Sequence, residues 1–331
     1  MRAYLYVMQK TLSFIDLRAI RHNARYVRSL IGDRFFYAVV KADGYGHGGE
    51  EVALCLQDLV DGFCVAIADE GVALRVSGVT KPVLVLTPPL DNQDAQKMAF
   101  YNLTPTVGDE RSANLCKNLP CHVALNTGMN RYGCYGEGLE RVLGILPKGG
   151  VEGVFTHLYA AHSARHCRAQ FAAFKKQLKA VKAHSPASLC HMAASGGILR
   201  GGKYLLNGVR CGLLLYGYAP HGFKARELKP ALKVYARLVQ RVQPFGYGVG
   251  YNVADEDYKN LYTYRLGYAD GFSRTVPLGE KTLCMDAFIS KRERNLFPVM
   301  TNAEEYAKSC NTISYEVLCS ATRRSERIYI R

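Results

Sequence analysis

The stretch from Phe36 to Gly48 reads FYAVVKADGYGHG and combines an amine with a glycine-rich turn. Lys41 follows an apolar run that is typical of a buried strand, and lysines are rarely buried without a partner or a role. At the C-terminal mouth of a barrel, where catalytic groups collect, such an amine can have a lowered pKa and form a Schiff base with an aldehyde. The alternative is a lysine whose stem lies along the rim and whose ammonium reaches water.

Other patterns that could bind a metal or a nucleotide are incomplete. His162 and His166 are spaced i, i+4 near His157 and Cys167, as in some zinc sites, but no further carboxylate or cysteine pair accompanies them. The motif GYGHGG lacks the βαβ spacing of a dinucleotide fingerprint, and no P-loop occurs. We therefore predict no metal site.

Eight short apolar runs, rich in β-branched and aromatic residues, recur before residue 220. They are Phe35–Val40, Phe63–Ala68, Pro82–Thr87, Leu103–Val107, His122–Leu125, Val154–Tyr159, Leu189–Ala194 and Val209–Tyr216. Several are continuously apolar, as in strands buried on both faces of a parallel sheet, and the segments between them mostly have helical patterning. This alternation predicts an α/β protein with a (β/α)₈ TIM-type barrel over about residues 30–220.

Beyond about residue 225 the pattern becomes that of a C-terminal β-rich domain. Strands are predicted at Leu232–Val242, Leu261–Leu266, Lys281–Ala287 and Tyr315–Ser320, with one helix at Ala303–Ser309. The expected domains are residues 1–225, the barrel with an N-terminal extension, and residues 226–331. The linker is His221–Pro230, which contains Pro, Gly and charged residues.

The chain of 331 residues carries 43 Lys and Arg against 28 Asp and Glu, a formal net charge of +15. This charge attracts phosphates, so nucleic-acid binding has to be considered. However, Arg18, Arg21, Arg25 and Arg28 follow helical spacing, and no aromatic residues interleave with them as a stacking platform requires. We interpret them as one solvated face of a packed helix and expect no nucleic-acid partner.

The eleven cysteines are odd in number and include no C-x-x-C pair, which argues against a disulfide framework. The N-terminal sequence has no signal-peptide core, and no run of about 20 apolar residues occurs. We expect reduced thiols, no membrane association and a soluble, cytoplasmic protein.

Eight motifs follow one another over nearly the whole chain. They are AVVKADGYGHG (38–48), NTGMNRYG (126–133), GVFTHL (153–158), VRCGLLLYG (209–217), YGVGYN (247–252), LGYADGFSR (266–274), CMDAF (284–288) and SYEVLCS (314–320). In this order the chain resembles the alanine racemases, pyridoxal 5'-phosphate (PLP) enzymes that have a barrel and a C-terminal β domain. Each motif alone is weak, but together they are very specific.

The resemblance implies two catalytic residues. Lys41 matches the lysine that holds PLP covalently, and Tyr268 matches a tyrosine that the other subunit of a homodimer supplies as the second acid/base. Inverting a stereocentre requires removal of a proton from one face and its return on the other, which calls for two groups. The resemblance assigns Lys41 to the D-face and Tyr268 to the L-face. Without it, Tyr268 would be read as a turn or rim aromatic.

The resemblance also implies a set of cofactor contacts. These are Tyr45, Tyr315, Ser195 and the backbone of Gly212 and Leu213 for the phosphate, Arg210 for the pyridine nitrogen, and His157 beside the ring. A guanidinium disfavours a protonated pyridine nitrogen and so weakens the ring as an electron sink. On residue type alone, Ser195 could be a helix N-cap, Tyr315 a buried sheet residue and Arg210 a strand-end surface residue.

Arg131 and Met285 match residues that bind the substrate carboxylate, Met285 through its backbone amide across the dimer interface. Three positions depart from the family pattern. Ala124 replaces a lysine that is carbamylated in many relatives, Asn126 replaces an aspartate, and Ala194 replaces an asparagine. An asparagine or a bound anion could orient Arg131 instead. The β domain is also shortened between residues 274 and 284 and after Ile289.

The expected function is PLP-dependent racemisation of a small amino acid, L-alanine to D-alanine, which supplies D-alanine for cell-wall peptidoglycan. The alternatives are a broader racemase acting on serine or basic amino acids, a decarboxylase, and a non-catalytic PLP-binding protein. A carrier has no use for a second base, so Tyr268 argues against the last of these. The sequence leaves open the substrate breadth, the rate and the group that replaces the carbamate.

Overall fold

The computed structural model describes residues 11–186, 188–253, 259–274 and 281–331. The expectation for the N-terminal ten residues lies outside this part of the chain. Contacts divide the chain into a barrel unit, residues 19–44 and 48–229, and a β unit, which contains residues up to Arg18, Tyr45–His47 and Pro230–Arg331. No helix in the described ranges is long and apolar enough to cross a membrane.

The barrel unit contains, within the described residues, one sheet of eight strands in the order β4-β3-β2-β9-β8-β7-β6-β5. The strands are β2 (Phe35–Val39), β3 (Gly62–Val65), β4 (Val83–Val85), β5 (Thr106–Val107), β6 (Cys121–Ala124), β7 (Val151–Phe155), β8 (Leu189–Ala193) and β9 (Gly208–Cys211). Thr104 closes the sheet, because it bridges Leu84 and exchanges backbone hydrogen bonds of 2.8 and 2.9 Å with Val83 and Val85. The predicted barrel is confirmed, and each apolar run overlaps one strand.

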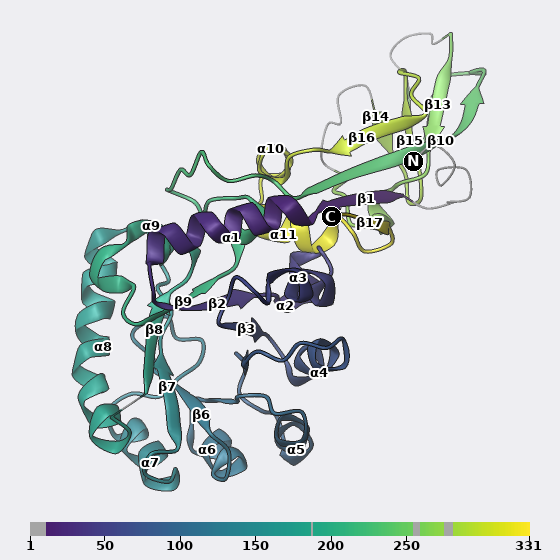
Figure 1. Ribbon diagram of the computed structural model, residues 1–331. Helices are drawn as coiled ribbons and strands as arrows, with labels where there is room; N and C mark the ends of the chain where they lie inside the picture. The colour runs from purple at the N-terminus through teal and green to yellow at the C-terminus, as the bar shows by residue number, and fades with distance from the viewer. Residues whose placement is uncertain (1–10, 187, 254–258, 275–280) are drawn as a thin grey trace. The chain divides into compact units, whose positions relative to one another are not determined.

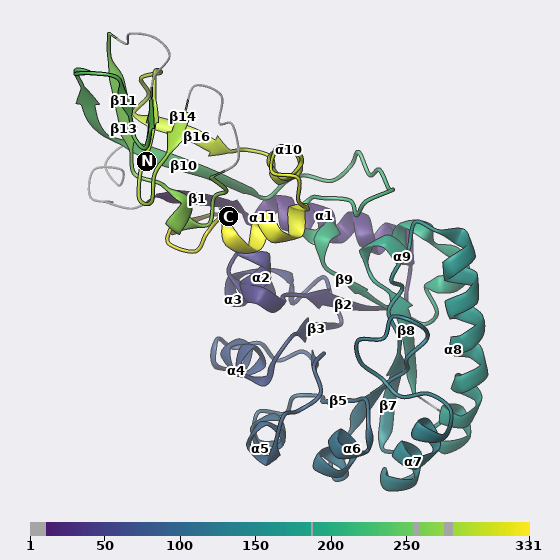
Figure 2. The ribbon, with the colours of Figure 1, turned by 180° about the vertical axis from the view of Figure 1, so that it is seen from behind.

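The helices of this unit lie around the strands, as Figures 1 and 2 show. Besides the helix over residues 17–31, which is described below, they are α3 (Gly49–Leu56), α4 (Ala68–Val76), α5 (Asn92–Phe100), α6 (Glu110–Cys116), α7 (Glu137–Ile145), α8 (Ala164–His184) and α9 (Ser195–Arg200), with short 3₁₀ turns η2 (Gly202–Tyr204) and η3 (Leu213–Tyr216). Val123, Val142, Val154 and Phe174 belong to the core cluster between strands and helices, and each is 0% exposed. Burial of this apolar surface is the main force that holds the helices on the barrel.

The β unit is built around one long strand, β10 (Leu232–Val242). Its mixed sheet has the order β14-β15-β13-β10-β1-β17, and β16 also pairs with β10. The other strands are β1 (Leu12–Asp16), β13 (Leu261–Tyr264), β14 (Lys281–Leu283), β15 (Phe288–Ser290), β16 (Leu296–Met300) and β17 (Glu326–Ile330), while β11 (Gly248–Val249) and β12 (Asn252–Val253) pair separately. The β-rich C-terminal domain is thus confirmed, and β1 from the N-terminal part of the chain joins its sheet.

One predicted strand is wrong. Tyr315–Ser320 lies in helix α11 (Ser314–Ser320), whereas helix α10 (Ala303–Ser309) has the predicted bounds. Alternating Tyr315, Val317 and Cys319 resemble a strand. However, the side chains that are buried, Ser314, Val317, Leu318 and Ala321, follow helical i, i+3, i+4, i+7 spacing.

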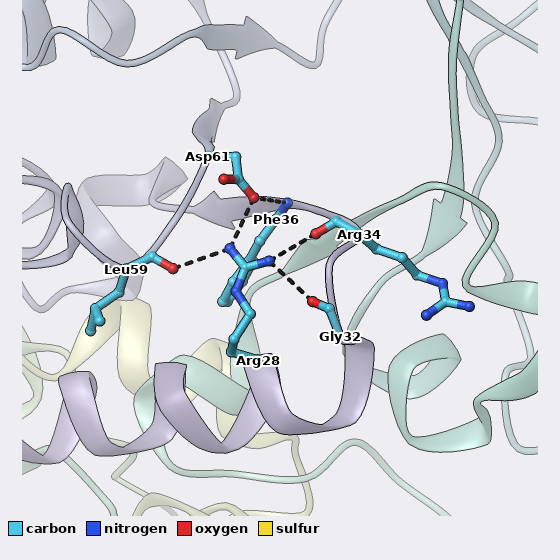
Figure 3. A network of polar contacts seen from close by, with 6 residues as sticks. All are labelled: Arg28, Gly32, Arg34, Phe36, Leu59 and Asp61. Carbon is cyan, nitrogen blue, oxygen red and sulfur yellow. Dashed lines mark hydrogen bonds and ion pairs between the residues drawn. The ribbon is translucent and has the colours of Figure 1, made fainter.

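Arginines of helix α1 (Leu17–Ile31) are engaged in ion pairs. The pairs are Arg18–Asp16 at 3.0 Å, Arg21–Asp58 at 2.6 Å and Arg28–Asp61 at 2.9 Å. Figure 3 shows that Arg28 also donates to backbone carbonyls, among them those of Arg34 at 2.9 Å and Leu59 at 3.3 Å. The basic stripe is therefore only in part a solvated face: Arg25 is exposed, while Arg28 connects the end of α1 to the start of β2.

Candidate active site

Lys41 follows β2 and opens the turn labelled α2 (Lys41–Tyr45). Its backbone conformation is unusual, because Ala42, Asp43 and Gly44 all have positive φ, at 52°, 54° and 59°. The amine is half-buried, and the pKa of Lys41 is lowered first by desolvation and then by the positive charge of Arg131, with a smaller contribution from Arg210. A lowered pKa increases the share of neutral amine, which is the form that attacks an aldehyde.

Arg210 lies at the end of β9 and is 3% exposed. Its Nη2 donates to the Thr156 carbonyl at 2.7 Å, its Nη1 to the His191 carbonyl at 3.2 Å, and the guanidinium stands 4.8 Å from the centre of the Phe155 ring. Burial lowers the pKa of Arg210 to about 10, so the group keeps its charge at neutral pH. It is a fixed buried cation rather than a strand-end surface residue.

Two histidines that the sequence interpretation did not single out extend this arrangement. His191 Nδ1 contacts Arg210 Nη1, and His191 Nε2 lies 2.9 Å from His122 Nδ1. A Cβ on Gly153 would lie 2.3 Å from the His122 ring, so glycine makes the room for that ring. Desolvation lowers the pKa of His122 to about 3 and also lowers that of His191. Both rings are neutral above mildly acidic pH.

His157 follows β7 at the same end of the barrel. Burial lowers the pKa of His157 to about 3, and Arg210, Arg131 and Lys41 contribute in that order. These contributions show that the imidazole lies within electrostatic reach of all three cations. Its carbonyl accepts a hydrogen bond of 2.9 Å from Gln170 Nε2, which fixes the backbone at this position.

Ser195 is the first residue of α9 and is 3% exposed. Its Oγ lies 3.3 Å from the backbone N–H of Gly212 and 3.4 Å from that of Leu214. The loop after β8 and the one after β9 therefore meet at this hydroxyl, where TIM-type barrels often bind phosphate. Leu213, named from the sequence, lies between the two donors in the chain and is fully buried.

Arg131 lies in an exposed loop after β6, with its guanidinium 5.6 Å from the centre of the Tyr132 ring. Asn126 organises the start of this loop, because its Oδ1 accepts the Gly128 N–H at 2.9 Å and its Nδ2 donates to Asn130 at 3.1 Å. Ala124 is buried in β6 and offers no polar group. The hydrogen bonds of Asn126 thus hold the loop that carries Arg131.

The β unit holds the remaining predicted residues. Tyr45, which is buried, and Tyr315 on α11 have ring centroids 5.8 Å apart. The close approach of this segment to α11 requires glycine at position 46, where a Cβ would lie 2.3 Å from the Leu318 carbonyl. Thr322 Oγ1 donates to the Gly46 carbonyl at 2.8 Å. The two tyrosines predicted for one phosphate are therefore neighbours.

Tyr268 and Met285 are also neighbours, although 17 positions separate them in the chain. The N–H of Tyr268 donates to the Cys284 carbonyl and that of Ala269 to the Met285 carbonyl, both at 3.0 Å. A Cβ on Gly267 would lie 2.1 Å from the Met285 carbonyl oxygen, so only glycine permits this approach. The two loops form one backbone-linked surface.

Arg324 joins the same two loops through their carboxylates. Its Nε lies 2.9 Å from Asp270, in the Tyr268 turn η4 (Tyr268–Asp270), and its Nη2 lies 2.7 Å from Asp286, next to Met285. Asp270 also accepts the Gly267 N–H at 2.7 Å. Hydrogen bonding to Asp286 and the charge of Asp270 raise the pKa of Arg324. The sequence interpretation did not include Arg324, Asp270 or Asp286.

The barrel unit thus brings together one set of predicted residues and the β unit another. The first set is Lys41, Arg131, His157, Ser195, Arg210, Gly212 and Leu213, and the second is Tyr45, Tyr268, Met285 and Tyr315. The barrel set fits PLP: an amine with lowered pKa suits an aldehyde, and the buried Arg210, the Ser195 hydroxyl and backbone donors suit a phosphorylated ring. Among the described residues no group of three or more His, Cys, Asp or Glu could hold a metal ion.

Residues 15–220 match the family profile described as "Alanine racemase, N-terminal domain". An alanine racemase of Carboxydothermus hydrogenoformans is 34% identical over 98% of this chain and 100% of its own length. The chain belongs to the alanine racemase family. The resemblance drawn from the sequence motifs is confirmed.

Solved structures of alanine racemases also match nearly the whole chain. That of Bacillus anthracis with bound L-Ala-P has a TM-score of 0.87 at 27% identity and covers 98% of this chain and 96% of its own. That of Bartonella henselae, with covalently bound pyridoxal phosphate, has a TM-score of 0.83 at 26% identity and covers 98% and 100%. The likeness to alanine racemases includes both the barrel and the β-rich part.

Proposed function

We propose that the protein is a PLP-dependent alanine racemase that interconverts L- and D-alanine. The observation that carries this proposal is the placement of Lys41, a partly buried amine of lowered pKa at the end of the first barrel strand, among Arg131, Arg210 and His157. Membership in the family gives the reaction type. A reducing cytoplasm suits the chain, because no disulfide joins any of its eleven cysteines, all of which lie in described ranges.

Each residue has a defined task in this proposal. When bound, PLP draws electron density from the α-carbon of the amino acid and so makes its hydrogen acidic. Lys41 Nζ moves the proton on one face and the phenol oxygen of Tyr268 moves it on the other. Arg210 places a permanent charge toward the pyridine nitrogen and disfavours a second one there. Arg131 and the backbone at Met285 bind the substrate carboxylate, and Ser195, Tyr45, Tyr315 and the loop at Gly212 bind the phosphate.

The proposed enzyme is a homodimer in which Tyr268 and Met285 complete the partner's site. Support comes from the backbone links between these residues, because they would move together as one surface. Complementation tests this assembly. Mixed dimers of Lys41→Ala and Tyr268→Phe chains should contain one intact site and recover about a quarter of the wild-type rate after random reassortment. No recovery would show that each chain uses its own tyrosine.

The reaction itself is tested with purified protein, added PLP and either L-alanine or L-serine. Chiral chromatography should detect D-alanine, and mass spectrometry should detect deuterium at the α-carbon when the solvent is heavy water. Faster conversion of L-serine would indicate a broader racemase, and ethylamine from alanine would indicate a decarboxylase. Bound PLP without any α-exchange would overturn the proposal in favour of a carrier.

Tyr268→Phe tests the second base separately. Loss of a positioned acid/base group costs about 10²- to 10⁴-fold, so racemisation should fall in that range while PLP stays bound. Exchange of the α-hydrogen of L-alanine should fall more than that of D-alanine. Unchanged rates in both directions would remove Tyr268 from the reaction.

A further inference from the structure

The backbone that follows Lys41 is held in a conformation that most residues avoid. Ala42, Asp43, Gly44 and Tyr45 have φ between 52° and 59°, which is the left-handed region. This conformation is unfavourable for residues other than glycine, and three of these four consecutive residues are not glycine. A conformation of this kind persists only where surrounding contacts enforce it, and such positions are concentrated at functional sites.

Backbone hydrogen bonds enforce part of the turn. The N–H of Gly44 donates to the Val40 carbonyl at 2.8 Å, and that of Gly48 to the Asp43 carbonyl at 3.0 Å. Asp43 Oδ1 also accepts the Gly49 N–H at 2.8 Å. These bonds hold the later part of the turn, but they do not involve the N–H of Ala42, the first left-handed residue and the neighbour of Lys41.

Glu70 supplies the contact for that N–H from another βα unit. Its Oε1 accepts the Ala42 N–H at 2.7 Å, and its Oε2 accepts the Ala66 N–H at 2.6 Å. Ala66 follows β3, the neighbour of β2, and Glu70 lies in the first turn of α4. One carboxylate thus joins the backbone after β2 to the backbone after β3. Hydrogen bonds from backbone N–H groups to a carboxylate are among the stronger ones.

Glu70 also acts on the amine electrostatically. Its negative charge raises the pKa of Lys41 and so opposes part of the lowering that burial and Arg131 cause. The Glu70 carboxylate therefore acts both on the backbone of Ala42 and on the charge of the Lys41 amine.

We propose that Glu70 is a positioning residue for Lys41: its carboxylate anchors the left-handed turn to the end of β3 and so fixes the direction from which the amine enters the site. This inference rests on the proposed function of Lys41. Glu70 has no contact with the reacting atoms in this role. It acts through the backbone of Ala42 and through the field at the amine.

The chain offers a matched control at the opposite end of the same strand. Asp61 Oδ2 accepts the Phe36 N–H at 2.8 Å, so it too is a carboxylate that binds a backbone N–H beside β2. Glu70→Gln and Asp61→Asn are each isosteric and remove one charge. At Glu70 the two N–H donors bind different oxygens, so the NH₂ group of Gln would face one of them. At Asp61 Arg28 and Phe36 donate to the same oxygen, which Asn can keep in place. The two variants differ in which end of β2 they disturb.

Hydrogen–deuterium exchange with fragmentation to single residues gives the first readout and needs no cofactor. Glu70→Gln should accelerate exchange at Ala42, at Ala66 or at both, because their N–H groups bind different carboxylate oxygens, and it should leave Phe36 unchanged. Asp61→Asn should leave Ala42 and Ala66 as in the wild type. Unchanged exchange at both Ala42 and Ala66 in folded Glu70→Gln, or unchanged exchange at Ala42 in folded Glu70→Ala, would overturn the proposal. Glu70→Ala should have the larger effect, and because Glu70→Gln preserves the shape, it decides the question if Glu70→Ala does not fold.

Kinetics and amine reactivity give the second readout. Glu70→Gln should lower kcat about 10- to 100-fold with KM for alanine changed less than about 3-fold, because misplacement of a catalytic group by about 1 Å costs that much. The pH profile for borohydride-fixed capture of PLP at Lys41 should move to lower pH, since a charge that raises the pKa is gone. If Glu70→Gln only lowered the stability of the protein, the pH profile for PLP capture would not shift. Wild-type kcat and an unshifted profile would contradict the proposal.

The two proposals fail in different ways. If the wild-type protein neither racemises alanine nor captures PLP at Lys41, the proposed function is wrong, while exchange at Ala42 still decides whether Glu70 holds the turn. If the wild type is active and Glu70→Gln matches it in every measurement, only the role of Glu70 is wrong.

Discussion

The two ends of strand β2 use charged residues for different purposes. At its N-terminal end Arg28 pairs with Asp61, and Asp61 in turn accepts the Phe36 N–H, so that each charge has an opposite charge within 2.9 Å (Figure 3). At its C-terminal end three cations, Lys41, Arg131 and Arg210, influence one another. Glu70, the carboxylate that acts on Lys41 there, is engaged with backbone N–H groups.

This difference follows the division of labour that is known for TIM-type barrels. Residues at the N-terminal face of the barrel mainly stabilise it, whereas those at the C-terminal face perform the chemistry. Cations gathered without equal numbers of anions cost stability, and an anionic ligand offsets that cost. The difference predicts that substitutions at the first end change the free energy of unfolding and those at the second change activity.

The largest effect is expected at Lys41. Lys41→Ala should reduce racemisation by at least about 10³-fold and abolish borohydride-fixed PLP, because the amine that we propose as the nucleophile is gone. The midpoint of urea unfolding of the protein without PLP should stay the same or rise, since a partly desolvated charge is removed. Retained covalent PLP at another lysine, shown by peptide mass spectrometry, would contradict the assignment.

Acid should destabilise the barrel through the histidines buried in its interior. The pKa of His122 is lowered to about 3, below its unfolded value, so the unfolded chain binds more protons. The stability contribution is therefore complete above about pH 6.5 and is lost as pH falls toward 3. At pH 5 the loss is about 2 kcal/mol for this one group.

Urea unfolding at pH 7.5 and pH 5.0 measures this loss. His122→Asn should shrink the difference between the two free energies of unfolding by about 2 kcal/mol. Substitution of the exposed His166 by Asn provides the control and should leave the difference as in the wild type. An equal pH dependence in wild type and His122→Asn would show that the imidazole is not neutral in the folded protein.

Arg28→Ala should destabilise the protein by about 1–3 kcal/mol, because it leaves Asp61 and part-buried carbonyls at Arg34 and Leu59 without this donor. Racemisation per folded molecule should not change. Urea unfolding and a rate normalised to folded protein measure the two quantities. A large loss of kcat with normal stability would break the proposed division between the two ends of β2.

The smallest effect is expected at Arg21, about two helical turns from Arg28 on the same stripe. Its partner Asp58 has a side chain that is 62% exposed, so water screens the pair. Arg21→Ala should therefore cost less than about 1 kcal/mol. The same urea titration measures it. A cost equal to that of Arg28→Ala would mean that the exposure of the partner carboxylate, 62% for Asp58 against 40% for Asp61, does not set the cost.

Much of the barrel could be predicted from the sequence because parallel strands buried on both faces appear as continuous apolar runs. The β unit was harder. Its strands β15, β16 and β17 are short or half-exposed, and β1 reaches its sheet from the other end of the chain, which no local pattern indicates. Helix α11 was missed because three alternating apolar residues suffice to imitate a strand in so short a segment.

Residues of the candidate site that belong to a sequence motif could be predicted. Residues whose role depends on contacts with distant parts of the chain could not. Lys41 follows directly from its position after an apolar run. His122 and His191 each appear as one polar residue in a strand, and only closure of the barrel brings β6 and β8 to a common interior. Glu70 appears as an ordinary acidic residue in the first turn of a helix, since its partners are backbone N–H groups that leave no sequence signal.

The hydrogen bonds that join Arg210, His191 and His122 run from donor to acceptor in one direction. A guanidinium only donates hydrogen bonds, so His191 must accept at Nδ1 and carry its proton on Nε2. That proton then points to His122 Nδ1, which fixes the tautomer of the second ring as well. Arg210 thus determines which nitrogen carries the proton in each of the two histidine rings. The direction of these hydrogen bonds cannot reverse, because Arg210 cannot accept one. They can therefore relay no proton toward Arg210.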